Sequence, residues 1–321
     1  MSHPHFARFI GRRLVAMAAV LVAMSFVIFL FLYLAPGSPE QILLGPREAT
    51  PDSVAAIRHE YHLDQPFLTQ YFLWAKNALR LDFGRSIITH ESVSHEIVQR
   101  FRFSIQLAGL AFGFVLLVGV PLGLFAASKR RTSVDRSIVA FSVAGISAPA
   151  FATGLLLLYL FAVKLAWFPV FGQGSGFFGR IWHLALPAIA LGLTAMGLIL
   201  RLTRAGAASV FDQDYVAFAR ARGVPRRRIM LAYVLRNALI PIVTASGLIL
   251  AYLIAGAVLV ETTFALPGLG SLLVEAITNK DIPVVQGLAM LIALTVVLIN
   301  LLTDLVYLAI DPRIAFEAAH A

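Results

Sequence analysis

Six apolar runs, each about twenty residues long, constrain this 321-residue chain more than any other feature. A helix needs about 20 apolar residues to cross the hydrocarbon core of a bilayer. Hydrophobic residues make up 59% of the chain and charged residues 13%, which excludes a soluble domain. The sequence therefore predicts an all-α integral membrane protein. Its six transmembrane helices are expected near residues 14–34, 105–127, 138–163, 184–200, 239–260 and 284–310.

A secretory signal peptide is the alternative interpretation of the first run. The run LVAMAAVLVAMSFVIFLFLYL is longer than the apolar region of a signal peptide, and the residues PGSP at 36–39 offer no small-residue cleavage site. We therefore expect residues 1–34 to form an N-terminal segment and a retained first transmembrane helix.

Basic residues are distributed unequally between the two sides of the membrane. The side that holds the N-terminus carries 16 lysine and arginine residues, and the other side carries 10. Seven of those ten lie in the long loop 35–102, and long loops cross a membrane largely regardless of charge. The positive-inside rule then predicts that both termini are cytoplasmic, including the tail 311–321.

The loop 35–102 is expected to be a small helical cap on the external side. It contains 7 basic and 8 acidic residues. Thr50-Pro51-Asp52 is typical of a helix start, and further helices are predicted over 67–81 and 93–101. A short amphipathic helix over 269–278, between the fifth and sixth spans, is expected at the same surface.

Histidines in the cap raise the possibility of a metal site. His59 and His62 are three residues apart, and His90 and His95 follow. Helical zinc sites space two histidines four apart and add a third ligand, which this pattern does not supply. We interpret these residues as exposed histidines and predict no metal site; with no cysteine in the chain there is also no disulfide or thiolate site.

Small residues and prolines inside the spans predict packing and kinks. The second span contains two pairs of glycines at four-residue spacing, which lets helices approach closely. These are Gly109 and Gly113, then Gly119 and Gly123. Pro149 and Pro187 interrupt the third and fourth spans and allow kinks where neighbouring groups satisfy the freed backbone.

Two acidic residues lie at or within the spans, and each has two interpretations. Glu261 ends the fifth span, either as an acid at the membrane surface or as a contact of an outer gate. Asp304 lies in the inner half of the sixth span, where an acid is costly. It either pairs with Arg201 or Arg204 or relays protons.

The chain lacks the P-loop that would bind ATP. That loop requires G-x-x-x-x-G-K-[ST], and none of the four lysines follows glycine or precedes serine or threonine. No hydrolytic triad or metal-hydrolase pattern is present either. The chain is therefore expected to be no enzyme and to hold no cofactor, so active transport would need another subunit to hydrolyse ATP.

The loop 201–238, between the fourth and fifth spans, holds five arginines within nine positions, 220–228. The residues FDQD at 211–214 predict a break and a new helix cap, followed by a helix over 215–222. Gly223 is expected to end that helix, and Pro225 suits the first turn of the next one.

The predicted short helix is narrow, with apolar anchors and basic flanks. Alanines keep one side small, Tyr215 and Phe218 offer aromatic contacts, and Arg220 and Arg222 lie at its end. Such a helix suits a groove on a partner protein, or alternatively an interface with lipid phosphates. Nucleic acid, which a net charge of +9 also suggests, is excluded by the position beside a membrane.

The stretch DYVAFARARGVPRRRIMLAYVLRNALIPIVT resembles the cytoplasmic EAA loop of bacterial ABC-importer permeases, in the dipeptide/oligopeptide/nickel branch. The strings LDQPFLTQYFLWAKNALRLDFGRS, VETTFALPGLG and NLLTDLVYLAIDPR are also similar to that branch, so the resemblance covers nearly the whole chain. Two departures from the wider ABC pattern, Ala217-Phe218-Ala219 in place of E-A-A and a proline at 241, are shared by the peptide branch.

The resemblance implies a type I ABC-importer permease fold in the bacterial cytoplasmic membrane, with a core over 103–310. The chain would be the first-type permease of a heteromeric pair and form half of a path for di- or oligopeptides. Its partners would be a homologous second permease, two cytoplasmic ATPase subunits or domains that bind ATP and Mg, and an extracytoplasmic solute-binding protein. That protein would dock on the cap 35–102 and on residues 264–283.

The resemblance also implies a coupling helix over 215–223 that contacts the ATPase. Its expected contact residues are Asp214, Tyr215, Phe218, Ala219, Arg220, Arg222, Gly223 and Arg226. Among these, we expect the small residues to transmit force and the arginines to anchor the loop. Alternative substrates are nickel chelates, glutathione or another small solute. The alternative from another class is a proton-coupled secondary transporter that uses Asp304.

Overall fold

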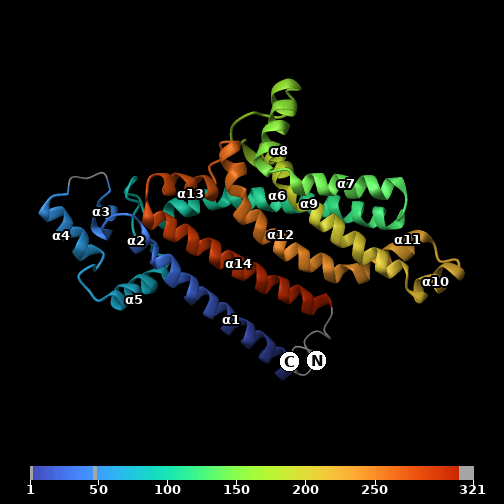
Figure 1. Ribbon diagram of the computed structural model, residues 1–321, viewed down its shortest axis with the longest axis horizontal. Coiled ribbons are helices and arrows are strands. Elements are labelled where there is room, and N and C mark those ends of the chain that lie inside the picture. The colour runs from blue at the N-terminus through green and yellow to red at the C-terminus, as the bar shows by residue number, and fades with distance from the viewer. Residues whose placement is uncertain (1–2, 46–48, 311–321) are drawn as a thin grey trace. The chain divides into compact units, whose positions relative to one another are not determined.

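The computed structural model describes residues 3–45 and 49–310, and these residues are predominantly helical (Figure 1). Within them five helices are long and apolar enough to cross a membrane, and a bent pair of helices is a sixth candidate. The prediction of an all-α protein with six spans is confirmed. The expected C-terminal tail, residues 311–321, lies outside the described residues.

The crossing helices are longer than the apolar runs that predicted them. They are α1 (His3–Phe29), α6 (Val93–Ser128), α9 (Gly176–Phe211), α12 (Arg236–Thr263) and α14 (Ile282–Ile310). The predicted outer helix over 93–101 is not separate, because it forms the first turns of α6. Hydropathy marks where a segment leaves the hydrocarbon, whereas the backbone continues as a helix into the polar region beyond it.

The third span is broken instead of being one helix over 138–163. Helix α7 (Ser133–Ser147) meets α8 (Ala150–Leu157) and the π-helix η1 (Leu158–Lys164) at a bend of 104°. The break falls at Pro149, whose ring disfavours a helical conformation for the preceding residue. Ala148 accordingly has extended backbone angles. The kink predicted at Pro149 is confirmed, and it is sharp enough to divide the span.

The described residues form two compact units, one of which comprises residues 3–6, 105–266 and 299–310. At its centre is α9, against which α7, α8 and α12 pack (Figure 1). The core of this unit consists of buried aliphatic side chains from these helices and from α6, such as Val115, Leu191 and Leu253. Glycines admit the close contacts: a Cβ at Gly197 would lie 2.4 Å from the carbonyl oxygen of Ser142 on α7.

The other unit comprises residues 7–104 together with 267–298. Besides parts of α1, α6 and α14 it holds five short helices: α2 (Phe31–Leu34), α3 (Pro39–Leu44), α4 (Pro51–Glu60), α5 (Phe67–Ala78) and α13 (Leu269–Thr278). Asp281, which is 3% exposed, accepts hydrogen bonds from the Ser86 hydroxyl at 2.5 Å and the Ile87 amide at 3.1 Å. Rings of Phe29 and Tyr71 pack α5 on α1.

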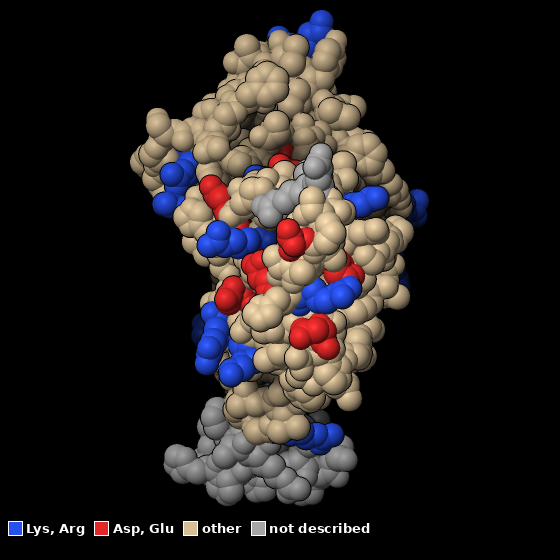
Figure 2. Space-filling model, turned by 90° about the vertical axis from the view of Figure 1, so that its left-hand side faces the viewer, with Lys and Arg blue, Asp and Glu red and all other residues tan. Residues whose placement is uncertain are grey.

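The predicted helix start in the cap is confirmed. Thr50 caps α4, accepting a hydrogen bond from the Ser53 amide at 3.2 Å, and Pro51 occupies the first helical position. Glu40 on α3 forms an ion pair with Arg58 at 2.9 Å; the backbone amide of Glu40 and this guanidinium hold the pKa of its carboxyl below the ordinary value. Figure 2 looks onto this part of the chain and shows acidic and basic side chains interspersed.

The four glycines of α6 differ in what surrounds them. A Cβ at Gly123 would lie 2.7 Å from the carbonyl oxygen of Leu200 and 2.8 Å from the Cβ of Thr203, both on α9. A Cβ at Gly113 would meet no atom within 4 Å. Among the glycines of α6, close approach to α9 is thus a property of the Gly119–Gly123 pair.

We predict that Gly123→Ala destabilises the chain by about 1–3 kcal/mol, because the added methyl group collides with the backbone of α9. The matched variant Gly113→Ala should leave stability unchanged or raise it, since alanine favours a helix more than glycine does. Thermal unfolding of the two variants in detergent measures the difference. Equal unfolding temperatures for the two variants would contradict the packing described above.

Candidate functional site

The predicted short helix is present as α10, over Asp214–Ala221. It lies beyond the end of α9 and before α11 (Arg226–Arg228), the π-helix η2 (Ile229–Leu235) and α12, as Figure 1 shows. The last three form one continuous helical segment over Arg226–Thr263. A short helix therefore joins two long helices of the same unit directly.

The start and the end of α10 follow the expected chemistry in part. The residue at its N-cap position is Gln213, within the stretch 211–214 expected to cap the helix, but its side chain makes no capping hydrogen bond. Asp214 instead lies in the first turn, where its charge is favourable toward the helix dipole. Pro225 precedes α11 as its cap residue, one position before the first turn in which we expected it.

Gly223 ends the helical turn as predicted. Its φ is +73°, a left-handed conformation that costs a residue with a Cβ about 1–2 kcal/mol. Its amide donates to the Arg220 carbonyl oxygen at 3.0 Å, and the Val224 amide donates to the Ala219 carbonyl oxygen at 3.0 Å. Backbone conformation, and not crowding, sets the requirement for glycine, because a Cβ here would meet no atom within 4 Å.

One face of α10 packs against the rest of its unit. Val216 is 0% exposed and Ala219 is 5% exposed. They belong to an apolar cluster with residues from the end of α6, the end of α9 and η2, among them Ala127, Val210 and Ile229. The expectation that the Ala219 side chain contacts a partner is therefore wrong, because the chain itself covers it.

The opposite face of α10 is exposed and carries the two aromatic residues. Phe218 is 71% exposed and Tyr215 is 43% exposed, with the Tyr215 ring stacked on Tyr233 of η2 at 6.3 Å between centroids. Asp214, Arg220 and Arg222 are also exposed. An exposed phenylalanine on a short, anchored helix is typical of a surface that binds another protein.

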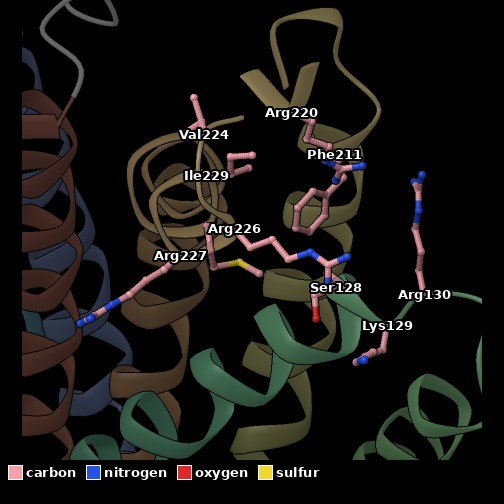
Figure 3. Close-up of a pocket in the computed structure, with 11 residues that line it drawn as sticks. Ser128, Lys129, Arg130, Phe211, Arg220, Val224, Arg226, Arg227 and Ile229 are labelled. Carbon is pink, nitrogen blue, oxygen red and sulfur yellow. The ribbon is translucent and has the colours of Figure 1, made fainter. Parts of the chain in front are cut away.

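Beside α10 lies a cavity of about 660 Å³, drawn in Figure 3. Its wall contains the end of α6 at Ser128, the end of α9 at Phe211, and the start of the segment 226–263. The Arg220 guanidinium lies 5.4 Å from the centroid of the Phe211 ring. Arg226, an expected contact residue, points into this cavity toward Ser128 (Figure 3).

Two ion pairs link neighbouring segments of this unit. Arg130 Nη1 lies 2.6 Å from a carboxylate oxygen of Asp212, which links the α6–α7 turn to the break before α10. Arg204 on α9 forms a two-pronged pair with Asp135 on α7, at 2.5 and 2.7 Å. Sequence reasoning missed both pairs, because their members are 82 and 69 residues apart.

The surroundings of the two acids at or within the spans differ in part from those expected. Arg204, offered as a partner for Asp304, is bonded to Asp135 instead, so that part of the expectation is wrong. Asp304 is half-buried on α14. Glu261 on α12 is 1% exposed, so its interpretation as an acid at the membrane surface is also wrong.

Val216 is the buried residue of α10 that sequence reasoning overlooked. Its spacing of three residues from Ala219 places both on one face of a helix, and this was the available signal. Among the described residues, no three His, Asp or Glu side chains lie close enough together to hold a metal ion.

Comparison with solved structures identifies the fold. Two structures of the MetNI methionine ABC transporter in inward-facing conformations align with TM-scores of 0.54 and 0.57. Each alignment covers 67% of this chain and 96% of the compared chain, at 17% and 16% sequence identity. The arrangement of helices is that of a type I ABC-importer permease.

Sequence comparisons cover nearly the whole chain. The probable peptide ABC transporter permease protein y4tP of Sinorhizobium fredii is 40% identical over 311 residues, which is 96% of this chain and 99% of that protein. The glutathione transport system permease protein GsiC of Escherichia coli is 37% identical over 310 residues, with the same coverage.

Two family models match successive parts of the chain. Residues 6–108 match the N-terminal part of binding-protein-dependent transport system membrane components. Residues 119–316, which include α10, match the binding-protein-dependent transport system inner membrane component. The chain therefore belongs to the family of inner-membrane permease subunits of binding-protein-dependent ABC importers, in its peptide branch.

Proposed function

We propose that this permease imports di- or oligopeptides and that α10 receives the motion of a cytoplasmic ATPase. The observation that carries the proposal is the division of α10 into two faces. Val216 and Ala219 are buried against the ends of three other helical segments, while Phe218 is 71% exposed. A protein that binds the exposed face would therefore push on the long helices through a packed apolar contact.

The connections of α10 support this role. The helix follows α9 after two residues and is followed by the segment 226–263 after four. Packed apolar interiors transmit displacement because they contain little free volume. A shift of α10 would thus move the inner ends of α9 and α12 together, and α9 is the helix on which α7 and α8 pack.

The charge distribution supports a cytoplasmic position for α10 and for both termini. Eight of the chain's 26 basic residues lie between the fourth and fifth spans, on the side that the positive-inside rule assigns to the cytoplasm. None of the four lysines lies in a P-loop pattern, which supports ATP and Mg binding by partner ATPases instead of by this chain.

The remaining partners follow from the same machine. A homologous second permease would supply the other half of the path, with this chain as the first-type member of the pair. An extracytoplasmic solute-binding protein would dock on the cap 35–102 and on residues 264–283. The mixed charge of the cap in Figure 2 suits a polar protein surface.

Peptides are the favoured substrate because of what related permeases transport. One relative is named for peptides and another for glutathione, which is itself a tripeptide. Uptake by the assembled transporter in proteoliposomes tests this. A labelled di- or tripeptide should accumulate when ATP is supplied, and its rate of uptake should not change when the proton gradient is collapsed. Accumulation of a nickel chelate but no peptide would overturn the substrate class, and uptake driven by protons without ATP would overturn the mechanism.

We predict that Phe218→Ala weakens binding of the ATPase by about 2 kcal/mol, roughly thirtyfold, because an exposed aromatic anchor is lost. Copurification in mild detergent measures the retained ATPase. The control is Phe178→Ala, which removes another exposed phenylalanine, at the opposite end of α9. Equal retention of ATPase by the two variants would argue against α10 as the contact.

Gly223→Pro should abolish ATP-driven uptake while the protein still inserts. Proline requires φ near about −65° and has no amide hydrogen, whereas residue 223 has φ of +73° and donates to the Arg220 carbonyl oxygen. Gly223→Asn is the matched variant, since asparagine tolerates the left-handed region, and it should retain most uptake. Normal uptake by the proline variant would show that the turn does not transmit motion.

A further inference from the structure

Five basic residues and no acidic residue line the cavity beside α10. They are Lys129, Arg130, Arg220, Arg226 and Arg227. Three separate segments supply them: the turn after α6, α10 itself, and the start of the segment 226–263. Their convergence results from folding, because the first and last of these residues are 98 positions apart.

Groups of this chain balance part of the charge. Asp212 pairs with Arg130 at 2.6 Å. The C-terminal ends of α6 and α9 both reach the cavity, and each contributes about half a negative charge through its dipole. Figure 3 shows the Arg227 side chain directed away from the cavity. Among the residues that the structure describes, the other four basic side chains leave about two positive charges in the wall without a counterpart.

Two of these cations are held where an anion would meet them. The Arg220 guanidinium rests on the Phe211 ring, 5.4 Å from its centroid, which restricts its motion. The Arg226 guanidinium extends across the cavity to the end of α6, next to Ser128 (Figure 3). Guanidinium groups bind phosphate oxygens in pairs, so two oriented arginines and Lys129 make a wall that matches a phosphate group.

The rest of the wall is apolar and includes Ala127, Ile229 and Met230. A volume of about 660 Å³ exceeds that of an inorganic phosphate and leaves room for a carbon-bearing part. Ala127 is also the last residue of the apolar run 105–127, which places the cavity where the second span leaves the hydrocarbon. Phospholipid headgroups occupy that level of a membrane.

We propose that this cavity is a binding site for an organic phosphate, with a phospholipid headgroup or a soluble phosphate ester as its source. The bound phosphate neutralises the excess charge and ties Arg220 of α10 to the ends of α6 and of the segment 226–263. The anion therefore sets how firmly α10 is held, independently of which protein binds the exposed face of the helix.

The lipid arm of the test places the assembled transporter in nanodiscs of phosphatidylcholine with or without phosphatidylglycerol. Native mass spectrometry then counts the phosphatidylglycerol molecules that stay bound to the transporter when it is released from the nanodisc. The double variant K129Q/R226Q should bind it about 25-fold more weakly, at about fivefold for each basic residue removed. The matched control is Arg228→Gln, since Arg228 is exposed and adjacent to Arg226 and Arg227 but does not line the cavity.

The soluble arm uses the same transporter in pure phosphatidylcholine and adds glycerol 3-phosphate, whose binding is measured by calorimetry. Selective loss of phosphatidylglycerol in the double variant identifies the lipid headgroup as the source, and selective loss of glycerol 3-phosphate identifies the soluble ester. Unchanged binding of both probes in the double variant would overturn the proposal. An equal loss in Arg228→Gln would overturn it too, because binding would then reflect general surface charge; thermal unfolding confirms that each variant is folded.

Discussion

The hydrocarbon core of a bilayer contains no water to bond with a peptide group, so each crossing segment must satisfy its own backbone. This chain meets the requirement with long helices, and among the described residues the sharp bend inside a candidate span is the one at Pro149. Ala148, just before it, is extended. Beyond the break, α8 packs on both α9 and α12, and a Cβ at Gly154 would lie 2.9 Å from the Phe264 ring and 3.6 Å from the Cβ of Ala190.

Inside such a bundle the side chains that matter most are often the smallest. Glycine at 123 or 197 brings α6 or α7 against the backbone of α9 at distances that a methyl group would not permit. Close packing of this kind couples the helices, because a displaced helix has little empty volume to enter. Helix α10 joins this network through Val216 and Ala219, which are buried among the ends of the same helices.

Near α10, some charged side chains of this unit form ion pairs, and the cavity beside the helix carries an excess of positive charge. Asp135 takes a bidentate hydrogen bond from Arg204, and Asp212 pairs with Arg130. Lys129, Arg220 and Arg226 line the cavity beside α10, with the Arg220 guanidinium resting on an aromatic ring. A protein contact on the outer face of α10 and an anion on its basic edge would thus use different side chains of one eight-residue helix.

The sequence by itself determined the fold class, the number of spans, the helix start at Thr50 and the glycine stop at Gly223. Apolar length, proline and glycine act locally, so their consequences can be read without knowing what lies nearby. The family was also readable, since its motifs run through the whole chain. Tertiary structure alone decided that Ala219 faces inward, that Arg204 bonds with Asp135 instead of Asp304, and that Glu261 is buried. These outcomes depend on which distant segments meet, and a residue's burial or partner is set by those neighbours and not by its own chemistry.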